Sequence, residues 1–87
     1  MCQVIILPDA FEDLSKLDKS IAQRITDKLA WLSDNFESIS PIPLQSNLSG
    51  LYKLRTGDWR IIYEVDHKNK TLYVHKVGHR REIYKIK

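Results

Sequence analysis

The sequence predicts an α+β fold, with two helices packed on one face of a sheet made from an N-terminal strand and an antiparallel three-stranded meander. Two observations support this prediction. Apolar residues recur with helical spacing between residues 11 and 32, and after residue 50 the pattern changes to short strand-like runs separated by turn residues. With 87 residues, 43% of them hydrophobic, the chain is expected to form one domain, residues 1–87, with a modest core.

The chain begins with an expected strand and an expected first helix. Gln3 to Leu7 is a short apolar run rich in β-branched residues, which favours a strand. After Pro8, the spacing Asp9-x-x-Glu12 has the form of a helix N-cap with its reciprocal acidic residue. We therefore expect a helix to about Leu17, with an apolar stripe on every third residue: Phe11, Leu14 and Leu17.

A second helix is expected to follow directly and to complete a helical hairpin. Asp18 can cap this helix, whose apolar residues have the spacing i, i+4, i+8, i+11: Ile21, Ile25, Leu29 and Leu32. The next stretch, Glu37 to Ser46, contains Pro41 and Pro43 and cannot continue a helix, so it is interpreted as a loop or extended connector.

The last part of the chain has the pattern of an antiparallel meander. Three strand-like runs cover Leu51 to Arg55, Trp59 to Asp66 and Thr71 to Gly78. They are separated by Thr56-Gly57-Asp58 and by residues 67–70, both of which are rich in turn-forming residues. The helices can then bury their apolar stripes against one face of the sheet.

The net charge of +3 is distributed unevenly between the two halves. Residues 1–50 carry four Lys/Arg and seven Asp/Glu, whereas residues 51–87 carry ten Lys/Arg and four Asp/Glu. The second half is therefore a candidate surface for a polyanion, and charge alone is also compatible with a solvated lysine-rich face.

Cysteine usage and hydropathy indicate the compartment. Cys2 is the sole cysteine, so no intrachain disulfide can form and nothing indicates an oxidising environment. The apolar run before Pro8 is far shorter than the roughly 7 to 15 residues of a signal peptide or the ~20 of a spanning helix. We expect a cytoplasmic protein without a membrane partner.

Strand alternation sorts the basic residues of the meander onto one face. Lys53 and Arg55 lie on the same face of one predicted strand, and Arg60 lies on the corresponding face of the next. If the apolar sets face the helices and the register permits, these three cations share the opposite face of the sheet. Cross-strand neighbours are only about 5 Å apart and like charges repel, so the arrangement favours a bound anion.

Sites of several other kinds are not expected. The chain has no glycine-rich phosphate loop and no serine nucleophile elbow, and Cys2, His67, His75 and His79 lack the paired spacing of a zinc site. His67 falls in a predicted hairpin loop, and His75 alternates with Tyr73 and Val77, which is typical of a core-facing or rim residue. No metal and no cofactor are expected.

Two long stretches of the meander carry a family resemblance. LSGLYKLRTGDWRIIYEV (48–65) and LYVHKVGHRREIY (72–84) resemble the RelE branch of the RelE/ParE superfamily of bacterial and archaeal toxins of toxin–antitoxin systems. The helical segment 11–32 fits the helix pair of that family, so the resemblance covers nearly the whole chain. It implies a twisted, mostly antiparallel sheet with two helices on one side, as expected independently from the residue pattern.

The resemblance also implies an activity, the metal-free cleavage of mRNA in the ribosomal A site. In this family the ribose 2′-hydroxyl attacks its own 3′ phosphate, and the step needs a base, cations around phosphorus and an acid. The matching positions are Lys53 and Arg55 for the pair of strand cations, Arg60 and Arg80 for the phosphate contacts, and Tyr84 for the residue that stacks on or orients the substrate base.

Two positions depart from the RelE pattern. Arg55 stands where that pattern has lysine, and because arginine stays protonated it is a poor general base, which leaves Lys53 as the more suitable base. His79 places an imidazole where the pattern has another basic residue, and an imidazole exchanges protons near neutral pH. His79 is therefore either the acid or base of the reaction or a residue that only packs beside Gly78.

Other residues near these positions have structural and functional interpretations. Arg80 and Arg81 are both candidates for RNA binding but are expected to point in different directions, and Arg80 is favoured because Arg81 can simply be solvated. Glu64 is either a general base or, more simply, a partner that screens the cations. Tyr52, Trp59 and Tyr63 are expected to build the core.

The resemblance implies partners and leaves alternative functions open. A RelE-type toxin binds a cognate antitoxin, usually encoded next to it, as well as the ribosome and mRNA. The alternatives are a ParE-like inhibitor of DNA gyrase and an inactive relative that only binds its antitoxin, because one fold can carry different functions.

Overall fold

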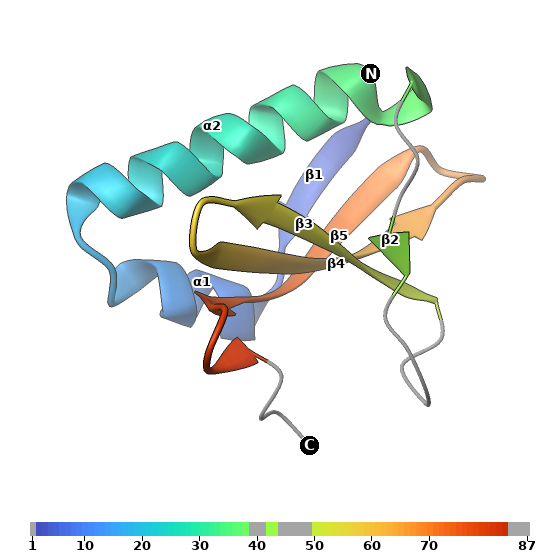
Figure 1. Cartoon of the computed structure of the whole chain (residues 1–87). Helices are drawn as coiled ribbons and strands as arrows, with labels where there is room; N and C mark the ends of the chain where they lie inside the picture. The colour runs from blue at the N-terminus through green and yellow to red at the C-terminus, as the bar shows by residue number, and fades with distance from the viewer. Residues whose placement is uncertain (1, 39–41, 44–49, 84–87) are drawn as a thin grey trace.

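A computed structural model describes residues 2–38, 42–43 and 50–83 of the chain and has the predicted α+β architecture (Figure 1). The strands form one five-stranded sheet in the order β1-β5-β4-β3-β2, with β1 parallel to β5 and the other pairs antiparallel. The elements are β1 Gln3–Ile6, α1 Pro8–Ser15, α2 Lys19–Asn35, the 3-10 turn η1 Phe36–Ser38, β2 Ile42–Pro43, β3 Leu51–Thr56, β4 Trp59–Asp66 and β5 Thr71–His79.

The first helix differs from its prediction at both ends. Helix α1 begins at Pro8 with Leu7 as its N-cap and no side-chain cap bond, so the predicted Asp9-x-x-Glu12 capping box is wrong. Proline suits the first helical position because its φ angle is already helical and its missing N–H would have no partner there. The helix ends at Ser15, and Phe11 is 66% exposed, so the predicted apolar stripe on α1 does not include Phe11.

The second helix and the connector agree more closely with the sequence. Helix α2 starts after Asp18, as predicted, although the Asp18 side chain makes no cap hydrogen bond. Its predicted stripe is confirmed, with Ile25, Leu29 and Leu32 buried. Within the predicted connector, Ile42–Pro43 forms the two-residue strand β2, which pairs with Tyr52 and Lys53 of β3.

The core lies between the helices and one face of the sheet. One cluster joins Ala10 of α1 and Ile25 of α2 to Ile61, Val74 and Val77 of the sheet. A second cluster, beside it, contains Cys2, Leu32, Tyr63 and Leu72. Tyr63 is fully buried, and Tyr52 and Trp59 pack against these clusters, which confirms that the three aromatic residues build the core.

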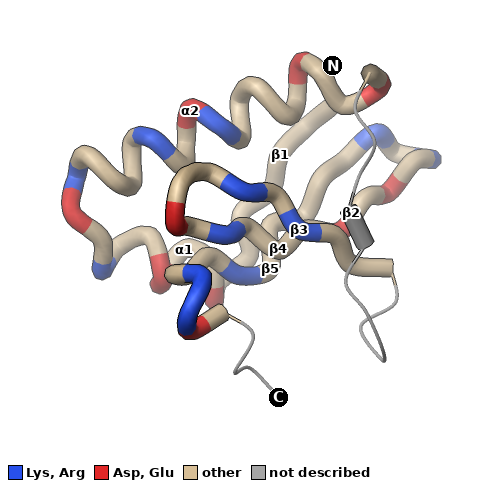
Figure 2. Tube along the Cα trace, viewed as in Figure 1, with Lys and Arg blue, Asp and Glu red and all other residues tan. Residues whose placement is uncertain are grey.

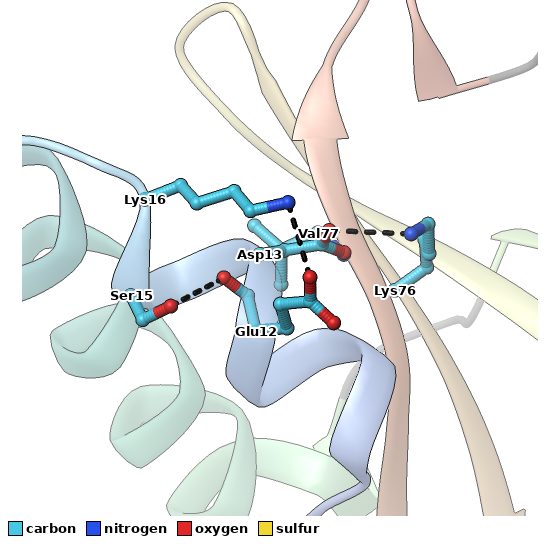
Figure 3. Close-up of polar contacts among 6 residues, drawn as sticks. All are labelled: Glu12, Asp13, Ser15, Lys16, Lys76 and Val77. Atoms are coloured by element: carbon cyan, nitrogen blue, oxygen red, sulfur yellow. Dashed lines mark hydrogen bonds and ion pairs between the residues drawn. The ribbon is translucent and has the colours of Figure 1, made fainter.

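Helix α1 replaces β1 as the neighbour of β5 where β1 ends. The last pair between these strands is Ile6 with Val74, and three residues further along β5 the Val77 N–H donates to Asp13 Oδ2 at 3.0 Å. The other oxygen of Asp13 is 3.2 Å from Lys76 Nζ (Figure 3). One carboxylate thus satisfies a strand N–H that would otherwise lack a sheet partner.

A β-bulge sets the side-chain directions along β5. The pairing with β4 shifts between Ile62, which faces Lys76, and Tyr63, which faces Val74, so His75 is the extra residue. As a result, Val74 and Val77 both face the helices although they are three residues apart. The strand pattern predicted that His75 and Val77 lie on the same face of the sheet, which is wrong, because the bulge places them on opposite faces.

The Tyr63 hydroxyl is buried without a hydrogen-bond partner among the described residues. Burial, with a smaller contribution from Tyr52, raises the pKa of Tyr63 to about 12 from 10.0. An unsatisfied buried polar group typically costs 1–3 kcal/mol, so Tyr63→Phe should raise the free energy of unfolding at pH 7 by about 1 kcal/mol in urea titrations. Tyr73→Phe, at a half-buried ring on the other face, should give no such gain.

The same variant should change the pH dependence of stability. A raised pKa means that the folded state holds the phenolic proton of Tyr63 more tightly than the unfolded state does. The resulting contribution to the free energy of unfolding is complete below pH 10 and is lost as pH rises toward 12. The wild type should lose about 2–3 kcal/mol more than Tyr63→Phe over that interval. Equal losses of stability in the two proteins would show that the Tyr63 hydroxyl is not buried.

Candidate functional site

The sheet face opposite the helices presents its side chains in three cross-strand rows. Alternation from the core residues Leu54, Ile61 and Val77 places the intervening residues on this open face. The rows are Arg55, Arg60 and Gly78 (the arginine row), Lys53, Ile62 and Lys76 (the lysine row), and Leu51, Glu64 and Tyr73 (the carboxylate row). The register therefore brings Lys53, Arg55 and Arg60 together on one face.

The arginine row sets two like charges directly against each other. Arg55 pairs with Arg60 across β3 and β4, and such opposition is unfavourable for stability. The Arg55 side chain is exposed, whereas Arg60 Nη1 donates to the carbonyl oxygens of Gly57 and Trp59, each at 2.9 Å. The Arg60 guanidinium is thereby held at the β3–β4 turn, close to the end of the sheet.

The C-terminal turn brings a further arginine to the same place. The Arg80 backbone N–H donates to the Asp58 carbonyl at 2.8 Å, and Arg80 Nε lies 3.7 Å from Asp58 Oδ1. Both side chains remain more than half exposed, so this ion pair is weak and an anion can compete for the guanidinium. Figure 2 shows the basic segments of β3, β4 and the C-terminal turn gathered around the acidic tip of the β3–β4 hairpin.

The lysine row surrounds a buried isoleucine. Ile62 is only 6% exposed although it lies on the face without helices. It stands between Lys53 and Lys76, whose aliphatic stems can cover apolar surface while their ammonium groups stay in water. Lys76 forms an ion pair with Asp13 at the β5 edge, with Nζ 3.2 Å from Oδ1.

Gly78 and Ile83 fix the path of the chain after β5. Ile83 is 4% exposed, and a Cβ atom on Gly78 would lie 3.0 Å from Ile83 Cδ1, closer than ordinary contact. Because Gly78 faces the open side opposite Arg60, Ile83 packs on that side. Sequence reasoning missed Ile83, although an isolated apolar residue after Arg80, Arg81 and Glu82 was a usable signal.

His79 is directed away from the cations of the open face. It pairs with Trp59 across the strands, and the two rings meet edge to face with centroids 5.5 Å apart. Its Nδ1 accepts a hydrogen bond from the Arg81 backbone N–H at 3.2 Å. The structure thus gives His79 packing and turn contacts and does not bring it together with Lys53, Arg55 and Arg60.

The remaining predicted residues have simple placements. Arg81 is exposed in the C-terminal turn, and Tyr84 lies outside the described residues. Glu64 contacts His75, with Oε1 and Nε2 2.8 Å apart. No group of three or more His, Cys, Asp or Glu side chains in residues 2–38, 42–43 and 50–83 is arranged to hold a metal ion.

In the part of the chain that the structure describes, neither α1 nor α2 is both long and apolar enough to cross a bilayer.

The chain is similar to known toxins in sequence and in fold. A family described as "ParE toxin of type II toxin-antitoxin system, parDE" matches residues 4–84. Toxin RelG of Mycobacterium tuberculosis is 35% identical over 43 residues, which make up 49% of each chain, so the match spans about half the length of that relative.

Solved structures match over more of the chain. A chain of the toxin–antitoxin complex RelBE2 from M. tuberculosis is 28% identical, with a TM-score of 0.81 over 91% of this chain and 98% of that one. The isolated RelE toxin of E. coli is 18% identical, with a TM-score of 0.75 over 98% and 93% of the two chains, a likeness of fold alone.

The contact between Gly78 and Ile83 can be tested with a double-mutant cycle. Gly78→Ala should lower the free energy of unfolding by about 1–3 kcal/mol because the new methyl group overpacks against Ile83 Cδ1. Ile83→Val removes that Cδ1 atom and alone should cost about 1 kcal/mol.

In the Ile83→Val background, Gly78→Ala should lower the free energy of unfolding by clearly less than it does in the wild type. Urea denaturation of the four proteins measures this coupling. Strictly additive effects would show that the C-terminal turn does not pack on Gly78.

Proposed function

Because the chain belongs to the ParE toxin family of type II toxin–antitoxin systems and is a RelE-type toxin of the RelE/ParE superfamily, we propose that it is a ribosome-dependent mRNA endonuclease. It would cleave mRNA in the ribosomal A site without a metal ion and so inhibit translation. Such an activity belongs in the cytoplasm, where ribosomes work.

One observation carries this proposal, the opposition of Arg55 and Arg60 on the open face, with Lys53 one pair further along. Like charges in register are unfavourable unless an anion lies between them, and an RNA backbone supplies anions at regular intervals. Arg80 approaches the same end of the sheet through Asp58. This arrangement supports the proposal that the cations bind a phosphate.

The proposed reaction is an internal transesterification. The 2′ oxygen bonds to phosphorus as the bond from phosphorus to the 5′ oxygen breaks, giving a 2′,3′-cyclic phosphate and a 5′-hydroxyl. A base takes the 2′-hydroxyl proton, and the departing 5′ oxygen gains a proton from an acid. Arg60 and Arg80 would stabilise the charge that builds on the phosphate oxygens.

The base is best assigned to Lys53. It lies on the open face beside the arginine row, whereas the guanidinium of Arg55 is a poor general base and suits charge stabilisation. His79, with its ring against Trp59 and its Nδ1 taken by Arg81, is the weaker candidate. For Tyr84 we propose the role that the family resemblance implies, stacking on or orienting the substrate base.

A second candidate function is inhibition of DNA gyrase, because the matched family is that of ParE toxins. The combination of Lys53, Arg55, Arg60, Arg80 and Tyr84, which ParE-like toxins usually lack, favours the RNA-cleaving activity over this one. The basic surface alone does not decide between them, because DNA and RNA both present phosphates.

We also propose a cognate antitoxin as the partner. The similar chains from M. tuberculosis RelBE2 and from the RelE–RelB complex of Pyrococcus horikoshii come from toxin–antitoxin complexes. The acidic first half and the basic second half of this chain offer opposite charges to a partner segment that folds on binding.

A parallel assay separates the candidate functions. Purified protein is added to translating ribosomes, to naked mRNA, and to gyrase with relaxed plasmid. We expect new 5′-hydroxyl ends in ribosome-bound mRNA, with little cleavage of naked mRNA and unchanged supercoiling. Intact transcripts on ribosomes together with blocked supercoiling would instead support gyrase inhibition.

Arg80→Ala should reduce cleavage and toxicity by about a hundredfold or more, since removing one donor to transition-state charge costs 10²–10³ in rate. The fold and antitoxin binding should be unchanged, as measured by circular dichroism and co-purification. Arg81→Ala, in the same turn, and Lys19→Ala, on exposed α2 surface, are the matched controls and should stay active. A folded Arg80→Ala protein with full toxicity would remove Arg80 from the site.

A further inference from the structure

The carboxylate row of the open face is a polar and aromatic patch set apart from the arginines. Glu64 and Tyr73 are cross-strand partners, and the β-bulge turns His75 onto the same face, with its Nε2 2.8 Å from Glu64 Oε1. The side chains of Glu64 and His75 are 48% and 36% exposed. The patch thus combines two rings and one carboxylate that solvent can reach.

Distance separates this patch from a phosphate held by the arginine row. Glu64 follows Arg60 by four residues on the same strand face, which corresponds to about 13 Å at roughly 3.3 Å per residue. The Arg60 guanidinium is bound to the Gly57 carbonyl, on the side away from Glu64, so the side chains do not close this gap. A single phosphate cannot lie within hydrogen-bond reach, about 3 Å, of both groups.

The charge of Glu64 decides which part of a nucleotide can approach it. A carboxylate repels phosphate but accepts hydrogen bonds at about four lone-pair positions, so contact with His75 leaves acceptor capacity. Single-stranded RNA is read by stacking bases on Tyr and His rings and by hydrogen bonds to base edges. Among the four bases, guanine alone presents two adjacent N–H donors, N1–H and N2–H, on its Watson–Crick edge.

We infer that Glu64, Tyr73 and His75 form a guanine-binding subsite beside the phosphate-binding arginine row. Tyr73 and His75 provide ring surfaces for the base, and the Glu64 carboxylate accepts from its two donors. His75 holds Glu64 in place across the bulge. The inference rests on one part of the proposed function, the binding of RNA to the open face.

The alternative role for Glu64 and His75 is proton transfer in the cleavage step. The separation of about 13 Å along β4 from Arg60 argues against it, because the reacting 2′-hydroxyl is adjacent to the scissile phosphate. The experiment below is designed to distinguish these two roles.

Binding is measured with RNA that cannot be cleaved. Labelled pentanucleotides UUNUU, with N as G, A, C or U, carry 2′-O-methyl groups that remove the nucleophile. By fluorescence anisotropy, the wild type should bind UUGUU about tenfold more tightly than the other three, as expected for a good bidentate base contact. Glu64→Gln should bring that ratio close to one, whereas Glu12→Gln, the same change on exposed α1 surface, should leave it unchanged.

The stacking contribution is tested at Tyr73. Tyr73→Leu keeps an apolar side chain but removes the ring, and should raise the Kd of all four oligonucleotides by about fivefold or more. Tyr73→Phe keeps the ring and should bind like the wild type. Circular dichroism establishes that each variant is folded.

The outcomes separate the subsite from the activity. No binding, no preference for guanine in the wild type, or an unchanged preference in Glu64→Gln would each overturn the subsite. Loss of ribosomal cleavage in Glu64→Gln with the preference intact would assign the pair to proton transfer and also overturn it. A preference lost in Glu64→Gln supports the subsite, even if the wild type proves not to cleave ribosome-bound mRNA and the proposed function fails.

Discussion

The register of β3 against β4 determines which side chains face the helices and which form the basic face. Only Gly57 and Asp58 separate the paired residues Thr56 and Trp59, and Gly57 has a positive φ of 61°, which suits a tight two-residue hairpin. Since side chains alternate, a shift of one residue would turn Lys53 and Arg55 toward the helices and expose Leu54. The same turn then supplies the carbonyl oxygens that hold Arg60 and Arg80, so one short hairpin sets both the core and the basic face.

Strand β5 completes the face through three local adjustments. The bulge at His75 adds a residue, so that Val74 and Val77 both reach the core while His75 joins Glu64 on the open side. Asp13 of α1 binds Val77 and Lys76 at the β5 edge beyond β1. Gly78 leaves room for Ile83, which packs against it on the open side. A strand near the sheet edge thereby becomes one wall of the proposed site.

Periodicity predicted the features that depend on neighbouring residues in sequence. The burial of Ile25, Leu29 and Leu32 and the shared face of Lys53, Arg55 and Arg60 follow from helical and strand spacing, and the structure has both. The bulge, the bond from Val77 to Asp13 and the packing of Ile83 were not predictable, because each depends on contacts between distant segments. The orientation of His79 toward Trp59 similarly depends on the cross-strand pairing.

In the proposed reaction, the basic open face directs a ribose 2′-hydroxyl onto its own phosphate. The most direct measurement maps cleavage of a ribosome-bound message, then repeats it with a single 2′-deoxynucleotide at the mapped position. The unmodified message should be cut there, leaving a 5′-hydroxyl end, and the substituted message should stay intact at that bond. Cleavage of the deoxy-substituted bond, or an intact unmodified message, would contradict the proposed reaction.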